Sequence, residues 1–123
     1  MHYFVTPTAY LTSGAVYLKH ILDALQRIEE YTQGVSYECF QKSNLIQAGV
    51  IRELEIVGEA TKRLSENTRM RYPHIPWNKM ARMRDKLIHG YFGVDLDAVW
   101  DTVKKDVPLL KTMLVEILEK ENK

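Results

Sequence analysis

The chain has 123 residues, of which 46% are hydrophobic and 27% charged, and a formal net charge of +1; this fits one globular domain with a core and excludes a disordered chain. Its single cysteine, Cys39, excludes an internal disulfide, and no apolar run approaches the roughly 20 residues of a membrane span. Because the first residues also lack the basic start and apolar core of a signal peptide, we expect a soluble cytoplasmic protein with no membrane contact.

The N-terminal residues differ in pattern from those that follow. Residues 1–14 show no helical period and contain a proline and a glycine, so we expect a flexible arm. Residues 15–123 are predicted to form a single domain. Its first helix is expected over about 15–33, where apolar residues recur three and four positions apart, with Ser13 as its cap. Gly34 suits the left-handed residue that ends a helix.

A second, longer helix is predicted from about Asn44 to Asn67, after a short turn capped by Ser36. Gly49 and Gly58 lie inside it, where each costs roughly 1 kcal/mol relative to alanine. This cost predicts the close approach of another backbone, either a neighbouring helix or a second copy of the chain.

The same helix carries a row of charged residues at spacings of three and four, namely Arg52, Glu55 and Glu59. Side chains at these spacings are neighbours on the helix surface, so Arg52 can pair along the helix. We interpret the row as a structural series of salt bridges in preference to a functional cluster.

Prolines then separate this helix from the next. Residues 68–76 include Pro73 and Pro76, each of which removes a backbone donor, so they are predicted to be a link. A third helix is expected from about Trp77 to Ile88 or slightly beyond. Its apolar side is formed by Met80, Met83 and Leu87.

The last helix is predicted over about Leu96–Glu121, with Asp95 as its cap. Pro108 lies inside it and should bend it near Lys104. Four amphipathic helices with short links and no strand pattern predict an all-α fold. We expect an antiparallel up-down-up-down four-helix bundle with a kinked last helix.

Positive charge is concentrated in residues 62–94, which carry eight Lys or Arg against two acidic residues, a net charge of +6. The segments on either side are net acidic. Such a basic segment suits an anionic partner, and the alternative is a solvated basic face.

Four residues near the end of this segment can perform acid–base chemistry on a phosphate. Arg84 offers a planar fork of donors that is always charged, and His89 can exchange a proton near neutral pH. Asp85 lies one helical turn before His89, so on a continuing helix it could fix the imidazole tautomer. Tyr91 adds a phenol. The alternative is that these residues are solvated helix residues.

The order Arg84, four residues, His89, one residue, Tyr91 resembles the signature of HEPN-domain toxins of the HepT type. The resemblance extends from about Val16 to Leu118. It includes the stretches Ile56-Val57-Gly58-Glu59-Ala60, Tyr72-Pro73-His74-Ile75-Pro76-Trp77 and Leu87-Ile88-His89-Gly90-Tyr91-Phe92-Gly93-Val94-Asp95.

The resemblance implies the toxin of a type II toxin–antitoxin system: a homodimeric four-helix bundle that cleaves RNA without a metal or cofactor. Arg84 and His89 of both subunits would line a shared cleft. It also implies a cognate minimal nucleotidyltransferase (MNT-type) antitoxin, which attaches AMP from ATP to the motif tyrosine, here Tyr91. AMP on Tyr91 would block the cleft by bulk and negative charge.

In the implied reaction the RNA 2′-hydroxyl attacks the adjacent phosphate, so no protein nucleophile is needed. His89 would move a proton and Arg84 would stabilise the transition-state charge. Asp85 and Tyr91 would support them. The flanking RNA backbone would be held by Lys79, Arg82 and Lys86.

The spacing of the motif raises a geometric question. Residues five apart on an ideal helix point roughly 140° away from each other, so Arg84 and His89 would not face one small target. Either the helix breaks near His89, or a second subunit supplies the complementary residue.

Two other classes of function compete with the nuclease. A non-catalytic helical subunit could present substrate or nucleotide to a nucleotidyltransferase from the same basic groove, without needing His89. A purely structural bundle would leave the motif without a purpose. A metal enzyme is not expected, because the four histidines are scattered along the chain.

Overall fold

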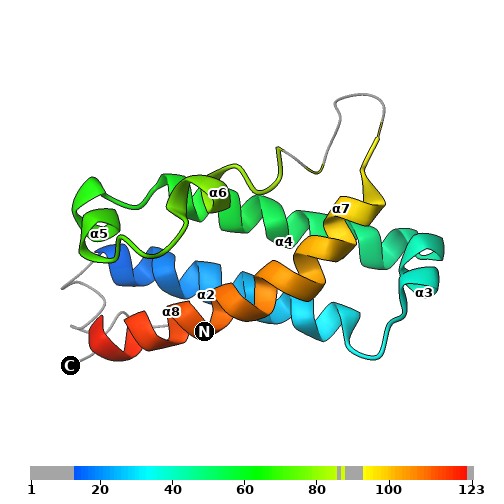
Figure 1. The fold of residues 1–123 in the computed structure, drawn as a ribbon, viewed down its shortest axis with the longest axis horizontal. Helices are drawn as coiled ribbons and strands as arrows, with labels where there is room; N and C mark the ends of the chain where they lie inside the picture. Colours follow the sequence, from blue (N-terminus) through cyan, green and yellow to red (C-terminus); the bar gives the residue numbers. More distant parts are fainter. Residues whose placement is uncertain (1–12, 86, 88–92, 122–123) are drawn as a thin grey trace, which may run out of the picture.

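The computed structural model describes residues 13–85, 87 and 93–121. Every element within these residues is helical, so the predicted all-α class is confirmed for this part of the chain (Figure 1). Residues 1–12 of the expected arm lie outside the described residues. Ser13, predicted to cap the first helix from outside, belongs to that helix, as does Gly14.

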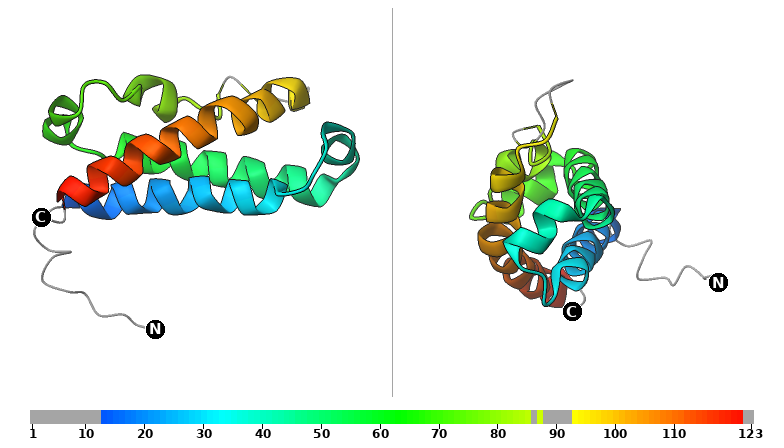
Figure 2. Two further views of the ribbon diagram at one scale, coloured as in Figure 1. Left: turned by 60° about the horizontal axis from the view of Figure 1, so that its bottom comes forward. Right: turned by 90° about the vertical axis from the view of Figure 1, so that its right-hand side faces the viewer.

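Two long helices form the base of the structure. α2 (Ser13–Thr32) and α4 (Asn44–Lys62) run antiparallel and side by side, and α8 (Val107–Glu121) packs on α2 (Figures 1 and 2). Of the apolar positions predicted for the first helix, Leu18, Ile21, Leu25 and Ile28 are buried and Leu22 is partly buried. The core residues of these three helices include Leu18, Ile21, Leu25, Ile28, Val50, Leu54, Val57, Leu110, Leu114 and Ile117. Burial of each such side chain contributes about 1.5–3 kcal/mol relative to exposure.

A buried carboxylate joins α2 to α4. Glu53 is 5% exposed, and its two oxygens accept hydrogen bonds from Arg27 Nε at 2.9 Å and from the Tyr31 hydroxyl at 3.2 Å. A charge at this depth requires such partners, because an unpaired one would cost several kcal/mol. The contact therefore sets the register of the two helices, and Glu55, two residues further on, points to a different face.

The turn between these helices follows its predicted caps. Gly34 has φ +72°, the left-handed conformation expected after the first helix. The Ser36 hydroxyl accepts the Cys39 N–H at the start of α3 (Tyr37–Lys42), and Ser43 does the same for Ile46 at the start of α4. Each such cap contributes about 1 kcal/mol.

The second long helix ends earlier than predicted. α4 stops at Lys62, and a separate helix, α5 (Glu66–Arg71), occupies part of the expected link. The Ser65 hydroxyl accepts the N–H of Thr68 and caps this new helix. Arg69 donates to the carbonyl of Thr61 at 2.8 Å, which ties α5 to the end of α4.

The third predicted helix is much shorter than expected. α6 covers only Trp77–Ala81, and the backbone then makes i-to-i−3 turns up to Leu87. Met83 and Leu87 are nevertheless buried, 4% and 5% exposed. The spacing of the apolar residues was read as an α-helix, but consecutive turns bury the same positions, so the prediction of helix length was wrong.

The last helix matches its prediction. α7 (Leu96–Asp101), a π-helical turn η2 (Thr102–Asp106) and α8 follow one another without a break. The side chain of Asp95 accepts the N–H of Ala98, as expected of the cap. Pro108 was predicted to bend this helix near Lys104. At this place the helix contains the π-helical turn η2, and the Val107 N–H bonds back to Thr102.

Gly58 confirms the predicted close approach of a neighbouring backbone. A Cβ atom built on Gly58 would lie 3.2 Å from the carbonyl oxygen of Ala81, the last residue of α6. At Gly49 the neighbour is instead a side chain, because a Cβ there would lie 3.1 Å from the Tyr31 ring.

The two glycines should therefore respond differently to alanine. Both substitutions gain about 1 kcal/mol of helix propensity. For Gly58→Ala we expect overpacking against a backbone carbonyl to exceed that gain and lower the free energy of unfolding by about 1 kcal/mol. For Gly49→Ala, the half-exposed Tyr31 ring can shift, so stability should be unchanged or higher. Urea denaturation measures both, and a Gly58→Ala protein as stable as the parent would contradict the constraint.

The C-terminal end of α8 is held by α5. Arg71 donates to the Glu121 carboxylate at 2.7 Å, and the Tyr72 hydroxyl makes a short hydrogen bond to the same oxygen. Burial by itself raises the pKa of Glu121, but the bonds from Tyr72 and Arg71 and the charge of Arg71 outweigh it, so this pKa lies below its ordinary value. Burial and the carboxylate raise the pKa of Tyr72.

This contact predicts a pH-dependent stability. Because the folded-state pKa of Glu121 is depressed, its contribution is present above the unfolded value of about 4.3 and is lost as pH falls through the folded-state pKa. Glu121→Gln should lower the free energy of unfolding by about 1–2 kcal/mol at pH 7 and by less at pH 3. Denaturation at both pH values tests this. Glu116→Gln, exposed on the same helix, is the control and should show no such difference.

Candidate active site

The structure describes part of the predicted motif. Arg84 and Asp85 are exposed residues in the turns that follow α6. Lys86, His89 and Tyr91 lie outside the described residues, so the distance from Arg84 to His89 is not defined. The helix that was predicted to carry Arg84 ends at Ala81, so Arg84 and Asp85 lie in turns and outside a helix.

Contacts before and after Arg84 hold this residue at the surface. Before it, the carbonyl of Ala81 lies against α4 at Gly58. On either side of it, Met83 and Leu87 are buried. The carbonyl of Leu87 also accepts the N–H of Asp95 at 2.9 Å, which joins this segment to the start of α7. Arg84 and Asp85 are therefore exposed residues that lie between the buried side chains of Met83 and Leu87.

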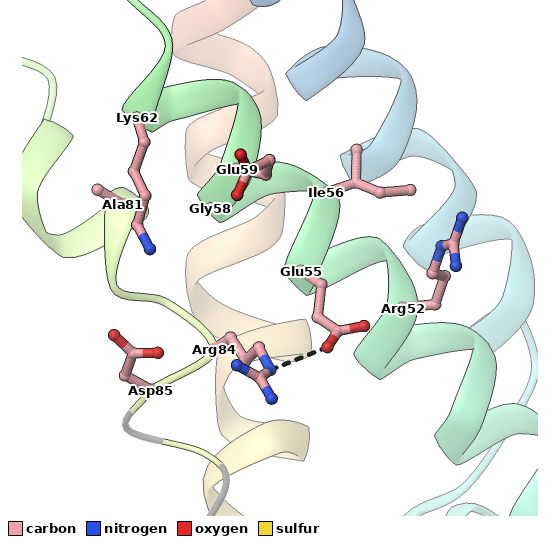
Figure 3. Close-up of a pocket in the computed structure, with 9 residues that line it drawn as sticks. All are labelled: Arg52, Glu55, Ile56, Gly58, Glu59, Lys62, Ala81, Arg84 and Asp85. Carbon is pink, nitrogen blue, oxygen red and sulfur yellow. Dashed lines mark ion pairs between the residues drawn. The ribbon is translucent and has the colours of Figure 1, made fainter.

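Arg84 forms an ion pair with α4. Its Nε lies 2.9 Å from Oε2 of Glu55, and the two side chains are 48% and 44% exposed (Figure 3). Glu55 was predicted to belong to a row of salt bridges along its own helix. It pairs across to another segment instead, whereas Glu59 does pair along α4, with Arg63 at 3.5 Å. Arg52 has no ion-pair partner among the described residues.

The ion pair lies in an open pocket of about 330 Å³ between α4 and the turns after α6 (Figure 3). Its lining combines three cations and three carboxylates with apolar surface from Ile56 and Ala81: Arg52, Glu55, Ile56, Gly58, Glu59, Lys62, Ala81, Arg84 and Asp85. The mixed charge suits a polar, anionic group that is bound by directed contacts, and it differs from a uniformly basic groove.

The residues predicted to hold the RNA backbone do not gather at this pocket. Lys79 makes an ion pair with Asp106 at 3.3 Å, which turns it toward η2. Arg82 is exposed but does not line the pocket. The pocket contains Arg52 and Lys62 instead, which sequence reasoning missed. Their spacing of three and four with Glu55 and Glu59 was the available signal, since it places all four on one face of α4.

Within residues 13–85, 87 and 93–121, no group of three or more His, Cys, Asp or Glu side chains is arranged to hold a metal ion. Over the same part of the chain, none of the helices combines the length and apolarity needed to cross a membrane.

Comparison with known proteins assigns the chain to a family. A family model described as "Ribonuclease HepT-like" matches residues 21–117. "Probable ribonuclease HepT" from Thermococcus cleftensis is 50% identical over 95 residues, 77% of this chain and 86% of the relative. "Putative RNase TTE0752" from Caldanaerobacter subterraneus subsp. tengcongensis is 43% identical over 105 residues, 85% and 94% of the two chains.

A longer relative matches over only part of its length. "Gamma-glutamylcyclotransferase and putative RNase MJ0434" from Methanocaldococcus jannaschii is 48% identical over 108 residues. These residues are 88% of this chain but only 49% of the relative, so the chain spans about half of that protein. No solved structure matches the chain.

The family model covers most of the chain, and the relatives agree with it at 43–50% identity. The predicted resemblance is confirmed at this level: the chain belongs to the HepT-like ribonuclease family.

Proposed function

We propose that this protein is an endoribonuclease that cleaves RNA without a metal, and that it is the toxin of a type II HEPN/MNT toxin–antitoxin system. The observation that carries the proposal is Arg84, the first residue of the motif. It is held exposed beside an open polar pocket in a chain of the HepT-like ribonuclease family. An always-charged guanidinium in this position is suited to a phosphate diester.

In the proposed reaction the 2′-oxygen bonds to the adjacent phosphorus and the bond to the 5′-oxygen breaks, which leaves a 2′,3′-cyclic phosphate. His89 takes the 2′-hydroxyl proton or gives a proton to the leaving 5′-oxygen. Arg84 stabilises the charge that develops on the equatorial phosphate oxygens. Asp85 and Tyr91 orient these groups. Arg52 and Lys62 are further cations of the pocket that contains Arg84. Arg82 and Lys86 hold the flanking RNA, whereas Lys79 is turned toward Asp106.

The assembly is part of the same proposal. The helices α2, α4, α6 and α7–α8 would form an up-down-up-down four-helix bundle, and two chains would associate about a two-fold axis. The support is local: Arg84 lies on an exposed pocket whose described lining supplies no histidine. A second subunit could complete such a site with its own motif.

Regulation by a partner completes the proposal. A cognate MNT-type nucleotidyltransferase antitoxin would transfer AMP from ATP to the hydroxyl of Tyr91. The added phosphate carries negative charge and would compete with RNA for Arg84, seven residues earlier in the chain.

Arginine and histidine substitutions test the activity. We expect His89→Ala to lower the rate of RNA cleavage in a chelator by about 10²–10⁴-fold and Arg84→Ala by about 10²–10³-fold. End-group analysis of the product should find a cyclic phosphate. Arg63→Ala removes the same charge as Arg84→Ala from an exposed arginine outside the pocket, and it should retain activity.

A folded His89→Ala protein that still cleaves at the parental rate would remove His89 from the mechanism. If the parental chain binds RNA but never cleaves it, the protein is instead a non-catalytic subunit that presents substrate or nucleotide to a nucleotidyltransferase.

Tyr91→Phe tests the modification. Incubation with the partner transferase and ATP should add AMP to the parental chain and none to the variant, because the accepting oxygen is absent. Intact-mass and peptide mass spectrometry measure this. Tyr17→Phe, a partly exposed tyrosine of α2, should be modified like the parent. AMP found on another residue would show that the assignment to Tyr91 is wrong.

A further inference from the structure

Two glutamates of α4 occupy equivalent positions with different partners. Glu55 and Glu59 lie one helical turn apart, both line the pocket, and both form an ion pair with an arginine. Glu59 pairs with Arg63 of its own helix. Glu55 pairs with Arg84, across the gap between α4 and the turns after α6. One carboxylate of the two is therefore coupled to the motif.

The ion pair with Arg84 has little value as a structural contact. Its two side chains are 48% and 44% exposed, and surface pairs with such exposure contribute little to stability because water and salt screen them. The segment is already anchored by the close approach at Gly58 and by the buried side chains of Met83 and Leu87. Because the ion pair adds little to stability, its main consequence is its effect on Arg84 itself.

That consequence is the direction of the guanidinium. The contact is made through Nε, the nitrogen nearest the side-chain stem. The opposite edge carries the two Nη nitrogens, whose parallel N–H groups match two oxygens of a phosphate. Arginine has a long, flexible stem, so an unrestrained guanidinium must be ordered whenever a phosphate binds. A carboxylate in contact with Nε fixes the direction of the guanidinium before the phosphate binds.

We propose that Glu55 is a positioning residue for Arg84: it holds the guanidinium by Nε so that the Nη edge faces a phosphate diester in the pocket. The inference rests on the proposed ribonuclease function and adds a residue to it. Glu55 does not touch the reacting atoms. It acts through Arg84, whose seat against α4 depends on the missing side chain at Gly58.

A matched pair of variants isolates this role. Glu55→Gln and Glu59→Gln each remove one negative charge from the same pocket, so the change in repulsion of RNA is matched between them. Only Glu55→Gln releases Arg84. We expect it to lower kcat about tenfold, whereas Glu59→Gln should leave kcat within twofold of the parental chain.

A double-mutant cycle shows whether the effect passes through Arg84. Lysine has a single terminal ammonium and no guanidinium that a contact at Nε could orient. In an Arg84→Lys background, Glu55→Gln should therefore change kcat by less than twofold. Equal kcat values for the two glutamate variants would overturn the proposal. So would a tenfold loss from Glu55→Gln that persists beside Arg84→Lys.

A chain that cleaves no RNA would contradict the proposed function and still leave the positioning role measurable. Two measurements on the full-length protein then test the role: the NMR resonance of the Arg84 Nε–H, and the affinity of the protein for an uncleavable 2′-O-methyl RNA. Glu55→Gln should shift the resonance and bind this RNA more weakly than Glu59→Gln does. An unshifted resonance, or equal affinities for the two variants, would overturn the role of Glu55.

Discussion

The pocket at Arg84 depends on the absence of a side chain at Gly58. Gly58 lets the last carbonyl of α6 come close enough to α4 that a Cβ would be 3.2 Å from it. From that contact the chain needs only three more residues to bring Arg84 within 2.9 Å of Glu55. A larger residue at position 58 would have to push the segment outward, and the opposing atom is backbone, which yields less readily than a side chain.

Two faces of α4 carry carboxylates that have different roles. Glu53 is buried, and hydrogen bonds from Arg27 and Tyr31 satisfy it, so it fixes α4 against α2. Glu55 is half-exposed on another face and meets the motif segment. In a low-dielectric interior the first contact requires all its partners, whereas the second can exchange with solvent and ligands. One helix thus supplies both a rigid support and an adjustable contact.

The pocket contains both cations and carboxylates, and this indicates a different mode of RNA binding from the one that the basic segment predicts. A basic segment in the sequence predicts a broad electrostatic footprint, but Lys79 is turned toward Asp106, and the other cations that line the pocket with Arg84 are Arg52 and Lys62 of α4. Each of these two is three residues along α4 from a glutamate of the same pocket. Such an arrangement favours a phosphate held in one orientation over a backbone attracted from any direction.

Local patterns in the sequence determined the helical class, the buried stripe of the first helix, the caps at Ser36 and Asp95 and the family. These features depend on residues within one or two turns of each other, or on a motif read in order, and so they are visible without coordinates. The length of the third helix was mistaken because turns and helix bury the same spacing. Only the tertiary structure paired Glu55 with Arg84, turned Lys79 away and brought Arg52 and Lys62 to the pocket, since each contact joins segments whose separation in space no local pattern encodes.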